Sequence, residues 1–564
     1  MQPTEPNALD EIDVEQQTQP RRSLRGRVPI REWKACPVMD RPETDNSYIP
    51  LNYQDAMNCP AAKNWKIATQ EEYQSLIDNG TWSIVSCPKD RTPIKSRWTF
   101  DIKPGLNGEP QRFKARFVAK GYSQRPGIDF NETYASVVSH DTLRILLSVI
   151  AADDLEALQV DVKTAFLYGP LEEEIFMDQP EGFVIPGQES KVCRLHKCIY
   201  GLKQASRVWG DLFTDFIEHH GFQRSEADPC LFSRVRGTEI TFLTTWVDDV
   251  IVASNQQQAI DGFLIALGEK FQFRSHPLQR YVGITIARDR EQRKLHISQP
   301  EYISQIVKKF YMASCSPKSI PADPNVHLVK PTEKKEEENA FPYREAVGAL
   351  LYLALVSRPD ISFAVGQVAR FVESYNLSHV KAVRQIISNI HGTPNHGICF
   401  AGSNRNPLVG FSDADYAGCQ TTRRSTTGSV FMYNGGIIAW CSRRQTCVAL
   451  STTEAEYVAA SETAKEAIWI RRILPIFQQG PEAPIVIKCD NQSAIQLVCH
   501  PDQRPKTKHI AIRYNFIRLQ QENGEIKMEF TRSADQLADI MTKALPSPRF
   551  HSIREELSNV PGFI

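Results

Sequence analysis

Two adjacent aspartates, Asp248 and Asp249, interrupt the apolar, β-branched stretch TFLTTWVDDVIVAS. The residues on either side are typical of strands, so the pattern predicts a hairpin with the acidic pair at its tip. A buried, unpaired carboxylate is costly, and a divalent cation is the usual compensation. An isolated Asp-Asp pair is also common in plain turns, so the interpretation depends on what accompanies it elsewhere in the chain.

A further acidic position lies upstream. The segment LEALQVDVKTAFLYG places Asp161 at the end of another alternating strand. Strand ends that are distant in sequence can meet in one sheet, where three carboxylates can hold two Mg²⁺ ions for in-line phosphoryl chemistry. Between the two positions, LHKCIYGLKQASRVWGDLF combines a glycine break at Gly201 with a basic and polar helix, which favours contact with a template or nucleotide.

Length and composition limit the class of protein. At 564 residues the chain is too long for one core, and a prior of ~100–200 residues per domain predicts three or four domains. Because 66 Lys and Arg balance 66 Asp and Glu, any basic surface for nucleic acid must be local. The 13 cysteines form no C-x-x-C motif, which predicts free thiols in a reducing intracellular compartment. No apolar run approaches ~18 residues, and the polar N-terminus does not resemble a signal peptide.

Composition also predicts the order of segments. Residues 1–48 are rich in proline, glutamine and charge and are predicted to be a disordered tail. An amphipathic helix is predicted over 56–79, before a basic antiparallel β region. A charged, proline-containing linker at 321–342 separates two folded blocks. A helical segment is predicted from 343 to about 391. The last block, from about 407 to 545, is predicted as strand, strand pair, long helix, strand, helix and helix.

Several motifs, in this order and spacing, resemble the reverse transcriptase and RNase H region of copia-type retrotransposon Pol polyproteins. They are DVKTAFLYGPLEEEIFMDQPEGF, CIYGLKQASRVW, WVDD, YVGITI, AVGALLYLALVSRPDI and FSDADYAG. The resemblance covers roughly residues 50 to 545 and implies an α+β fold. It implies a right-hand polymerase with fingers, palm and thumb, followed by an α/β RNase H-like domain with a mixed sheet. The implied divisions are a polymerase over 49–320, a linker over 321–342, a helical connection over 343–406, the RNase H-like domain over 407–545 and a C-terminal tail over 546–564.

The resemblance also implies roles for residues at the first site. Asp161, Asp248 and Asp249 correspond to the catalytic aspartates that hold the metal ions. Phe166 corresponds to the aromatic steric gate that excludes a ribose 2′-hydroxyl. The remaining predicted nucleotide contacts are Lys114, Arg116, Tyr200 and Gly201. For Lys114 an ordinary solvated strand lysine is a strong alternative.

A second set of carboxylates occupies the C-terminal block, where the resemblance implies four carboxylates around two Mg²⁺ ions. In STTEAEY, Ser451 and Glu454 form an S-x-x-E capping box, which leaves Glu456 as the ligand. Asp535 and Asp539 compete near the end of the block, and the resemblance of ADIMTK to the family's ADxxTK favours Asp539. The predicted quartet is Asp413, Glu456, Asp490 and Asp539.

The function that the resemblance implies is an RNA-directed DNA polymerase with an attached RNase H. The implied cofactor is Mg²⁺, two ions per site, with Mn²⁺ as a substitute. The implied partners are RNA template, DNA or RNA primer, RNA-DNA hybrid and dNTPs, with no membrane. The expected location is the cytoplasm, in a virus-like particle, with the nucleus as a second location.

Two other hypotheses stay open. One is a remnant that binds RNA-DNA hybrids without efficient catalysis, and the other is a host DNA polymerase, against which the RNase H block argues. The chain departs from the family pattern, without loss of a proposed ligand, at Tyr168, Ser206, Trp246, Cys419, Ala511 and Asn515.

Overall fold

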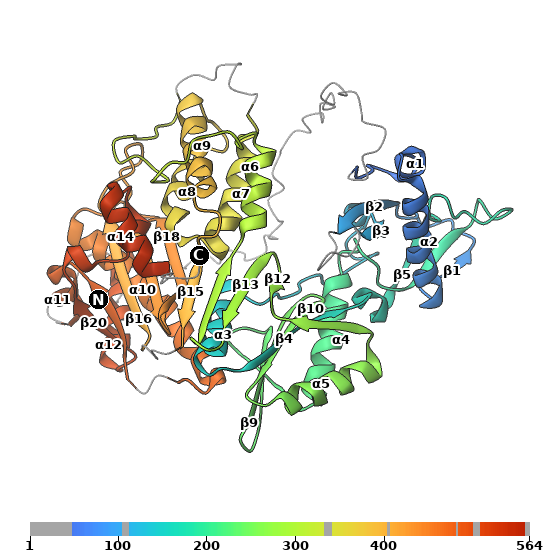
Figure 1. Cartoon of the computed structure of the whole chain (residues 1–564), viewed down its shortest axis with the longest axis horizontal. Helices are drawn as coiled ribbons and strands as arrows, with labels where there is room; N and C mark the ends of the chain where they lie inside the picture. The colour runs from blue at the N-terminus through green and yellow to red at the C-terminus, as the bar shows by residue number, and fades with distance from the viewer. Residues whose placement is uncertain are drawn as a thin grey trace, which may run out of the picture.

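The computed structural model describes residues 48–103, 112–331, 341–402, 407–480, 483–499 and 508–558, with the backbone alone described over 508–514 (Figure 1). The predicted disordered tail lies outside these residues except for Tyr48, and so does the centre of the predicted linker. Over the described ranges, no helix is both long enough and apolar enough to cross a membrane.

The N-terminal lobe, at the right of Figure 1, consists of two helices and two small sheets. One helix was expected over 56–79, but there are two, because Pro60 lacks an N–H and separates them. Trp65 is fully buried and packs edge-on against Phe100 and Phe113, so the second helix lies over a strand pair. The elements of the lobe are α1 (Tyr53–Asn58), α2 (Ala62–Asp78), the sheet of β2 (Ser96–Lys103) and β3 (Arg112–Ala119), and the sheet of β1 (Trp82–Val85), β6 (Val192–Lys197) and β5 (Pro170–Met177).

The acidic hairpin belongs to a six-stranded antiparallel sheet, called here the hairpin sheet, with the order β11-β4-β10-β9-β8-β7. Its strands are β4 (Glu156–Val162), β7 (Gln223–Arg224), β8 (Leu231–Arg236), β9 (Glu239–Trp246), β10 (Asp249–Ser254) and β11 (Phe273–Pro277). The predicted hairpin is confirmed, since β9 ends at Trp246 and β10 begins at Asp249.

Helices cover both faces of the hairpin sheet, which explains the unbroken apolar run after the acidic pair. Val250 and Val252 of β10 pack in the core that includes α4 (Ala205–His219) and α5 (Gln257–Lys270). Ile251 and Ala253 of the same strand pack in the other core, with α3 (His140–Ala152). A strand buried on both faces needs apolar residues at consecutive positions.

A smaller sheet joins distant parts of the chain, with the order β12-β13-β14-β15. Its strands are β12 (Arg280–Tyr281), β13 (Ile284–Asp289), β14 (Lys294–Ser298) and β15 (Ile398–Ala401). Residues 343–406 were expected to form a helical connection, but they also contain the strand β15. The helices around it, at the top of Figure 1, are α6 (Pro300–Lys309), α7 (Tyr343–Val356), α8 (Ser362–Ala369) and α9 (Leu377–His391), and they share a separate core.

The C-terminal block, residues 407–558 at the left of Figure 1, contains a five-stranded mixed sheet with the order β18-β17-β16-β19-β20. Strand β19 pairs in parallel with β16 and with β20, while the other pairs are antiparallel. The strands are β16 (Val409–Asp415), β17 (Thr426–Tyr433), β18 (Gly436–Arg444), β19 (Ile485–Cys489) and β20 (Ile526–Phe530). The helices are α10 (Thr452–Ile473), α11 (Gln492–Cys499), α12 (Lys508–Glu522), α13 (Asp539–Thr542) and α14 (Ser547–Ser558).

Two expectations for this block are wrong. The predicted element order lacked β20, the edge strand of the sheet. The predicted tail at 546–564 begins instead with α14, whose Phe550, Ile553 and Leu557 are buried. Both elements owe their position to packing against the rest of the block, because neither is long enough to be stable alone.

The hairpin sheet and the C-terminal block share one continuous core. Arg144 on α3 is almost fully buried and donates to the carbonyl oxygens of Leu355, Val356 and Ile438, at 3.0, 3.1 and 2.6 Å. Its guanidinium lies 4.0 Å from the centre of the Trp440 ring on β18. These contacts hold α3, the end of α7 and β18 together.

Two candidate active sites

The first site is the acidic end of β4 and β10. Asp161 and Asp249 lie directly opposite each other in the antiparallel pairing of these strands, so their side chains project from the same face. Asp248 precedes Asp249 in the turn. Val247 before it has a φ of +57°, and its carbonyl accepts a hydrogen bond of 2.7 Å from Trp209 Nε1. The structure therefore brings the three predicted aspartates together, with Asp161 at the end of β4 and the other two at the turn that Trp209 braces.

Burial and repulsion between the carboxylates raise the pKa values of two of these aspartates. Burial, together with the neighbouring Asp161, raises the pKa of Asp248. Burial, with Asp248 and Asp161, raises the pKa of Asp249 to about 6. Crowded carboxylates of this kind favour either protonation or a bound cation.

A cavity of about 250 Å³ opens between the hairpin sheet and the N-terminal lobe, with Asp161 and Asp248 in its wall. Its basic wall residues come from two strands and a loop and are Arg112, Lys114, Arg116, Lys163 and Arg274. Carboxylates on one side and basic groups on the other suit a ligand that carries both phosphates and metal ions. Lys114 and Arg116, which the sequence predicted as nucleotide contacts, therefore line this cavity, and the sequence did not indicate Arg112, Lys163 and Arg274.

Tyr200 forms part of the same wall. Its hydroxyl lies 3.4 Å from Asp248 Oδ2, and the guanidinium of Arg116 lies 4.8 Å from its ring centre. The predicted gate residue Phe166 is buried behind it, with the ring centres 4.7 Å apart. Phe166 is therefore placed to support Tyr200 and does not itself line the cavity.

Gly201 has a structural explanation of its own. Its φ is +93°, and a Cβ atom there would lie 2.1 Å from the carbonyl oxygen of Ala119. The adjacent Tyr200 carbonyl accepts a hydrogen bond of 2.8 Å from the Ala119 N–H. Gly201 thus allows β3, which carries the basic residues, to approach the turn that carries Tyr200. A direct contact with a nucleotide stays a prediction for this residue.

Glu72 on α2 is an acidic wall residue that no sequence motif indicated. Its Oε1 accepts a hydrogen bond of 3.3 Å from the Phe117 N–H, and burial raises its pKa in spite of that bond and of nearby Arg116 and Lys114. Only its position on the inner face of the helix at 62–78 could have indicated it.

The second site lies around the carboxyl-terminal ends of β16 and β19, two neighbouring parallel strands in the interior of the C-terminal sheet. Asp413 is on β16, Glu456 in the second turn of α10, Asp490 directly after β19 and Asp539 at the start of α13. Asp413, Glu456 and Asp539 are 3%, 6% and 5% exposed. The charge of Asp413 acts on Glu456, and those of Asp490 and Asp539 act on Asp413. The predicted quartet is therefore brought together.

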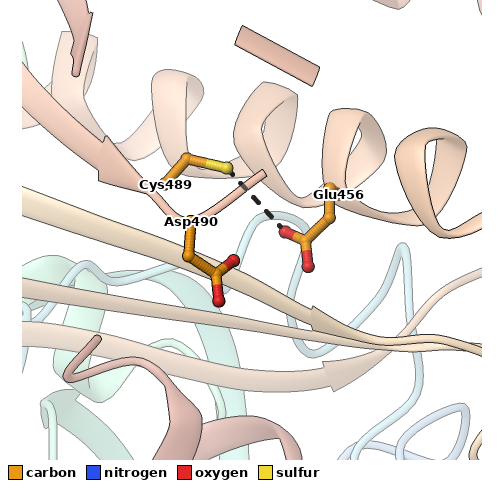
Figure 2. A group of neighbouring side chains, drawn as sticks. All are labelled: Glu456, Cys489 and Asp490. Carbon is orange, nitrogen blue, oxygen red and sulfur yellow. Dashed lines mark hydrogen bonds between the residues drawn. The ribbon is translucent and has the colours of Figure 1, made fainter. Parts of the chain in front are cut away.

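Figure 2 shows one half of this quartet, with Glu456 and Asp490 beside the thiol of Cys489. One ligand atom from each of these residues lies within 4.8 Å of the others. The backbone N–H of Ala414 donates to Glu456, and Ser533 Oγ donates to Asp490 at 2.8 Å. Cys489 was not predicted, and no signal in the sequence distinguished it from an ordinary core cysteine.

The other half holds two basic groups. Lys543 Nζ lies 2.7 Å from Asp539 Oδ1 and 3.9 Å from Asp413 Oδ2, and Arg549 Nη2 lies 3.6 Å from Asp539 Oδ2. Thr542 Oγ1 donates a short hydrogen bond to Asp413. These neighbours were missed, although Thr542 and Lys543 belong to the ADIMTK motif that identified Asp539.

The surroundings of the predicted ligands differ from those of their competitors. Burial, with Asp413 and Asp490 nearby, raises the pKa of Glu456 to about 9, and burial raises that of Asp413 to about 6. By contrast, Glu454 accepts from the Leu450 N–H at 2.7 Å, while its own N–H donates to the Ser451 cap at 3.1 Å. Asp535 is paired with Arg532 at the surface, at 2.7 Å.

Residues 79–324 match the model of a family described as reverse transcriptase (RNA-dependent DNA polymerase). The chain is 39% identical over 543 residues to a retrovirus-related Pol polyprotein from transposon TNT 1-94 of Nicotiana tabacum. It is 36% identical over 502 residues to one from transposon RE1 of Arabidopsis thaliana. These alignments cover 95% and 88% of this chain but 40% and 34% of the relatives.

A solved structure of a foamy viral protease-reverse transcriptase with double-stranded DNA covers 83% of this chain and 70% of its own, at 13% identity and a TM-score of 0.48. That overlap is too loose to bear on the assignment. The family match and the aspartates on the β9–β10 turn define a chain with a reverse transcriptase domain. The chain belongs to the copia-type retrotransposon Pol family, and it spans about 40% of the length of its tobacco relative.

Proposed function

We propose that the chain is an RNA-directed DNA polymerase with an attached RNase H. In this proposal the N-terminal lobe serves as fingers, the hairpin sheet as palm and the β12–β14 region with α6 as thumb. The C-terminal block serves as the RNase H-like domain. The observation that carries the proposal is the register of β4 and β10, which groups Asp161, Asp248 and Asp249 within the segment that matches the reverse transcriptase family.

The residues present fit divalent metal ions at both sites. Carboxylate oxygens are the ligands that Mg²⁺ prefers, and burial, together with neighbouring carboxylates, raises the pKa values of Asp249 and Glu456. Asp161, Asp248 and Asp249 would hold Mg²⁺ or Mn²⁺ at the first site, and Asp413, Glu456, Asp490 and Asp539 at the second. When bound, the ions activate the attacking hydroxyl or water and neutralise the leaving oxygen.

The other wall residues of the first site bind and orient the substrate. Lys114 and Arg116 bind the triphosphate of a dNTP through charge-assisted hydrogen bonds. Tyr200, supported by Phe166, packs against the sugar and template base and disfavours a ribose. The template is RNA and the primer is DNA or RNA, so specificity comes from base pairing while the protein grips the backbone of the hybrid.

The test is extension of a DNA primer on a labelled RNA template with dNTPs and Mg²⁺. Two double variants are compared with the wild type, Asp248→Ala/Asp249→Ala and Asp413→Asn/Asp490→Asn. We expect the first variant to lose extension while it retains RNA cleavage, and the second to show the reverse.

Asp215→Asn, an exposed change on α4, serves as the control and is expected to retain both reactions. Hybrid binding by the wild type without extension would contradict the polymerase and favour the binding remnant. Extension with no RNA cleavage would contradict the RNase H alone.

A further inference from the structure

The two halves of the second site differ in the positive charge that they already contain. Lys543 Nζ bridges Asp539 and Asp413 at 2.7 and 3.9 Å, in the place where two carboxylates would share a metal ion. The Glu456–Asp490 half, shown in Figure 2, instead has a thiol as its neighbour. An ammonium group and a metal ion cannot occupy the same position between two carboxylates.

Lys543 has room to change its position, whereas the backbone bonds of Arg549 hold it in place. Arg549 donates to the carbonyl oxygens of Ala534, Ser533 and Gln536 at 2.5, 3.1 and 2.9 Å, so its guanidinium is committed to the backbone. The Lys543 side chain is 46% exposed. It also lines a cavity of about 560 Å³ beside α8 and α9, which gives its long side chain room to leave the carboxylates.

A second acidic group lines the cavity that the Lys543 side chain could enter. Asp415, two residues after Asp413 on β16, lines the same cavity as Lys543. An ammonium group that leaves Asp413 and Asp539 therefore finds another carboxylate, together with the solvent in the cavity.

We propose that Lys543 is the resident counter-cation of the Asp413–Asp539 half and that a divalent ion enters this half only by displacing its ammonium group towards Asp415. The proposal rests on the proposed RNase H site. It makes the two metal positions unequal, because one ion binds without competition in the Glu456–Asp490 half while the other competes with Lys543. Lys543 is thus a positioning residue that sets the metal concentration at which the site fills.

The experiment is Mn²⁺ titration of the full chain by calorimetry in an Asp248→Ala/Asp249→Ala background, which removes the polymerase site. We expect Lys543→Met to tighten the weaker of the two binding events about tenfold, equivalent to about 1.4 kcal/mol, and Lys543→Arg to leave it unchanged or weaker. Lys465→Met is the matched control, because Lys465 is 51% exposed and also pairs with a carboxylate, Glu462, at 3.0 Å. An unchanged weaker event in a folded Lys543→Met protein would overturn the proposal.

A second measurement needs no substitution at Lys543. In the same background, reductive methylation followed by mass spectrometry reports the reactivity of each lysine with and without Mn²⁺. We expect Mn²⁺ to increase the reactivity of Lys543 several-fold and to leave Lys465 unchanged, and no increase would overturn the displacement. If Mn²⁺ does not bind to this background, or binds equally when Asp490→Asn is added, the RNase H site itself fails. If Mn²⁺ binds there but Lys543 does not respond, this inference alone fails.

Discussion

Asp161 on β4 and Asp249 on β10 face each other directly across an antiparallel strand pair. Like charges in such a position destabilise a sheet by roughly 0.2–1 kcal/mol, so the ionised pair costs stability that protonation or a bound cation recovers. We expect Asp249→Asn to raise the metal-free unfolding free energy by roughly this amount, measured by denaturant titration in EDTA. The same change should slow nucleotide addition by roughly 10²–10³-fold. Asp215→Asn should change neither quantity, and a loss of metal-free stability in Asp249→Asn would contradict the repulsion.

The second site predicts a pH dependence of stability in the absence of metal. The pKa of Glu456 rises from 4.5 to about 9 on folding and that of Asp413 from 3.8 to about 6, so the folded protein holds the extra protons. Stability from these groups is complete below their unfolded pKa values and is lost as the pH rises through the folded ones. We therefore expect the melting temperature in EDTA to fall from about pH 5 to about pH 9, and Glu456→Gln to flatten the fall above about pH 6. A melting temperature that rises over this range would contradict the assignment.

We expect the ring of Phe166 to affect how strongly the first site prefers dNTP to rNTP. Its ring supports Tyr200 at 4.7 Å, and a smaller side chain would let Tyr200 recede from the cavity. We expect Phe166→Val to reduce the preference for dNTP over rNTP by roughly 10–100-fold in kcat/KM, measured by single-nucleotide extension. Phe166→Tyr keeps the ring and should retain most of the preference. An equal loss in both variants would argue against a role for ring size.

Loss of the Arg144 side chain should lower the stability of more than its own helix. Its substitution leaves buried carbonyl oxygens of α7 and β18 without a donor and removes the contact with Trp440. We expect Arg144→Met to lower the unfolding free energy by roughly 3–5 kcal/mol and to separate the calorimetric transition into two. Arg290→Met removes two exposed pairs, with Asp154 and Glu156, and should cost about 1 kcal/mol or less. A single transition with a small shift in Arg144→Met would show that the two blocks are held together elsewhere.

The sequence predicted the hairpin that carries Asp248 and Asp249 because its signals are local. Two strand-like runs around Asp248 and Asp249 specify a hairpin, and apolar residues at consecutive positions specify a strand covered on both faces. The competition between Glu454 and Glu456 was also decided locally, by the cap at Ser451. By contrast, the basic residue Lys163, the supporting position of Phe166 and the bridge made by Lys543 depend on which segments meet in space. No periodicity in the sequence encodes such meetings.

Short elements were missed for the same reason. Strand β20 and helix α14 are stable only against neighbours far away in the chain, and Pro60 outweighed the helical pattern around it. Strand β15 escaped notice because ICFA is brief and follows a long helical stretch, yet it pairs with β14 about a hundred residues earlier.

The pairing of β15 with β14 and the buried Arg144 together fix the distance between the two acidic centres. With β15 hydrogen-bonded to β14 and α3 locked against β18, the two acidic centres cannot drift independently along a bound duplex. Under the proposed function, RNA cuts made during synthesis would fall at one characteristic distance behind the growing DNA end. The size of the released RNA pieces would be set by the rigid middle of the protein and would be independent of the template sequence.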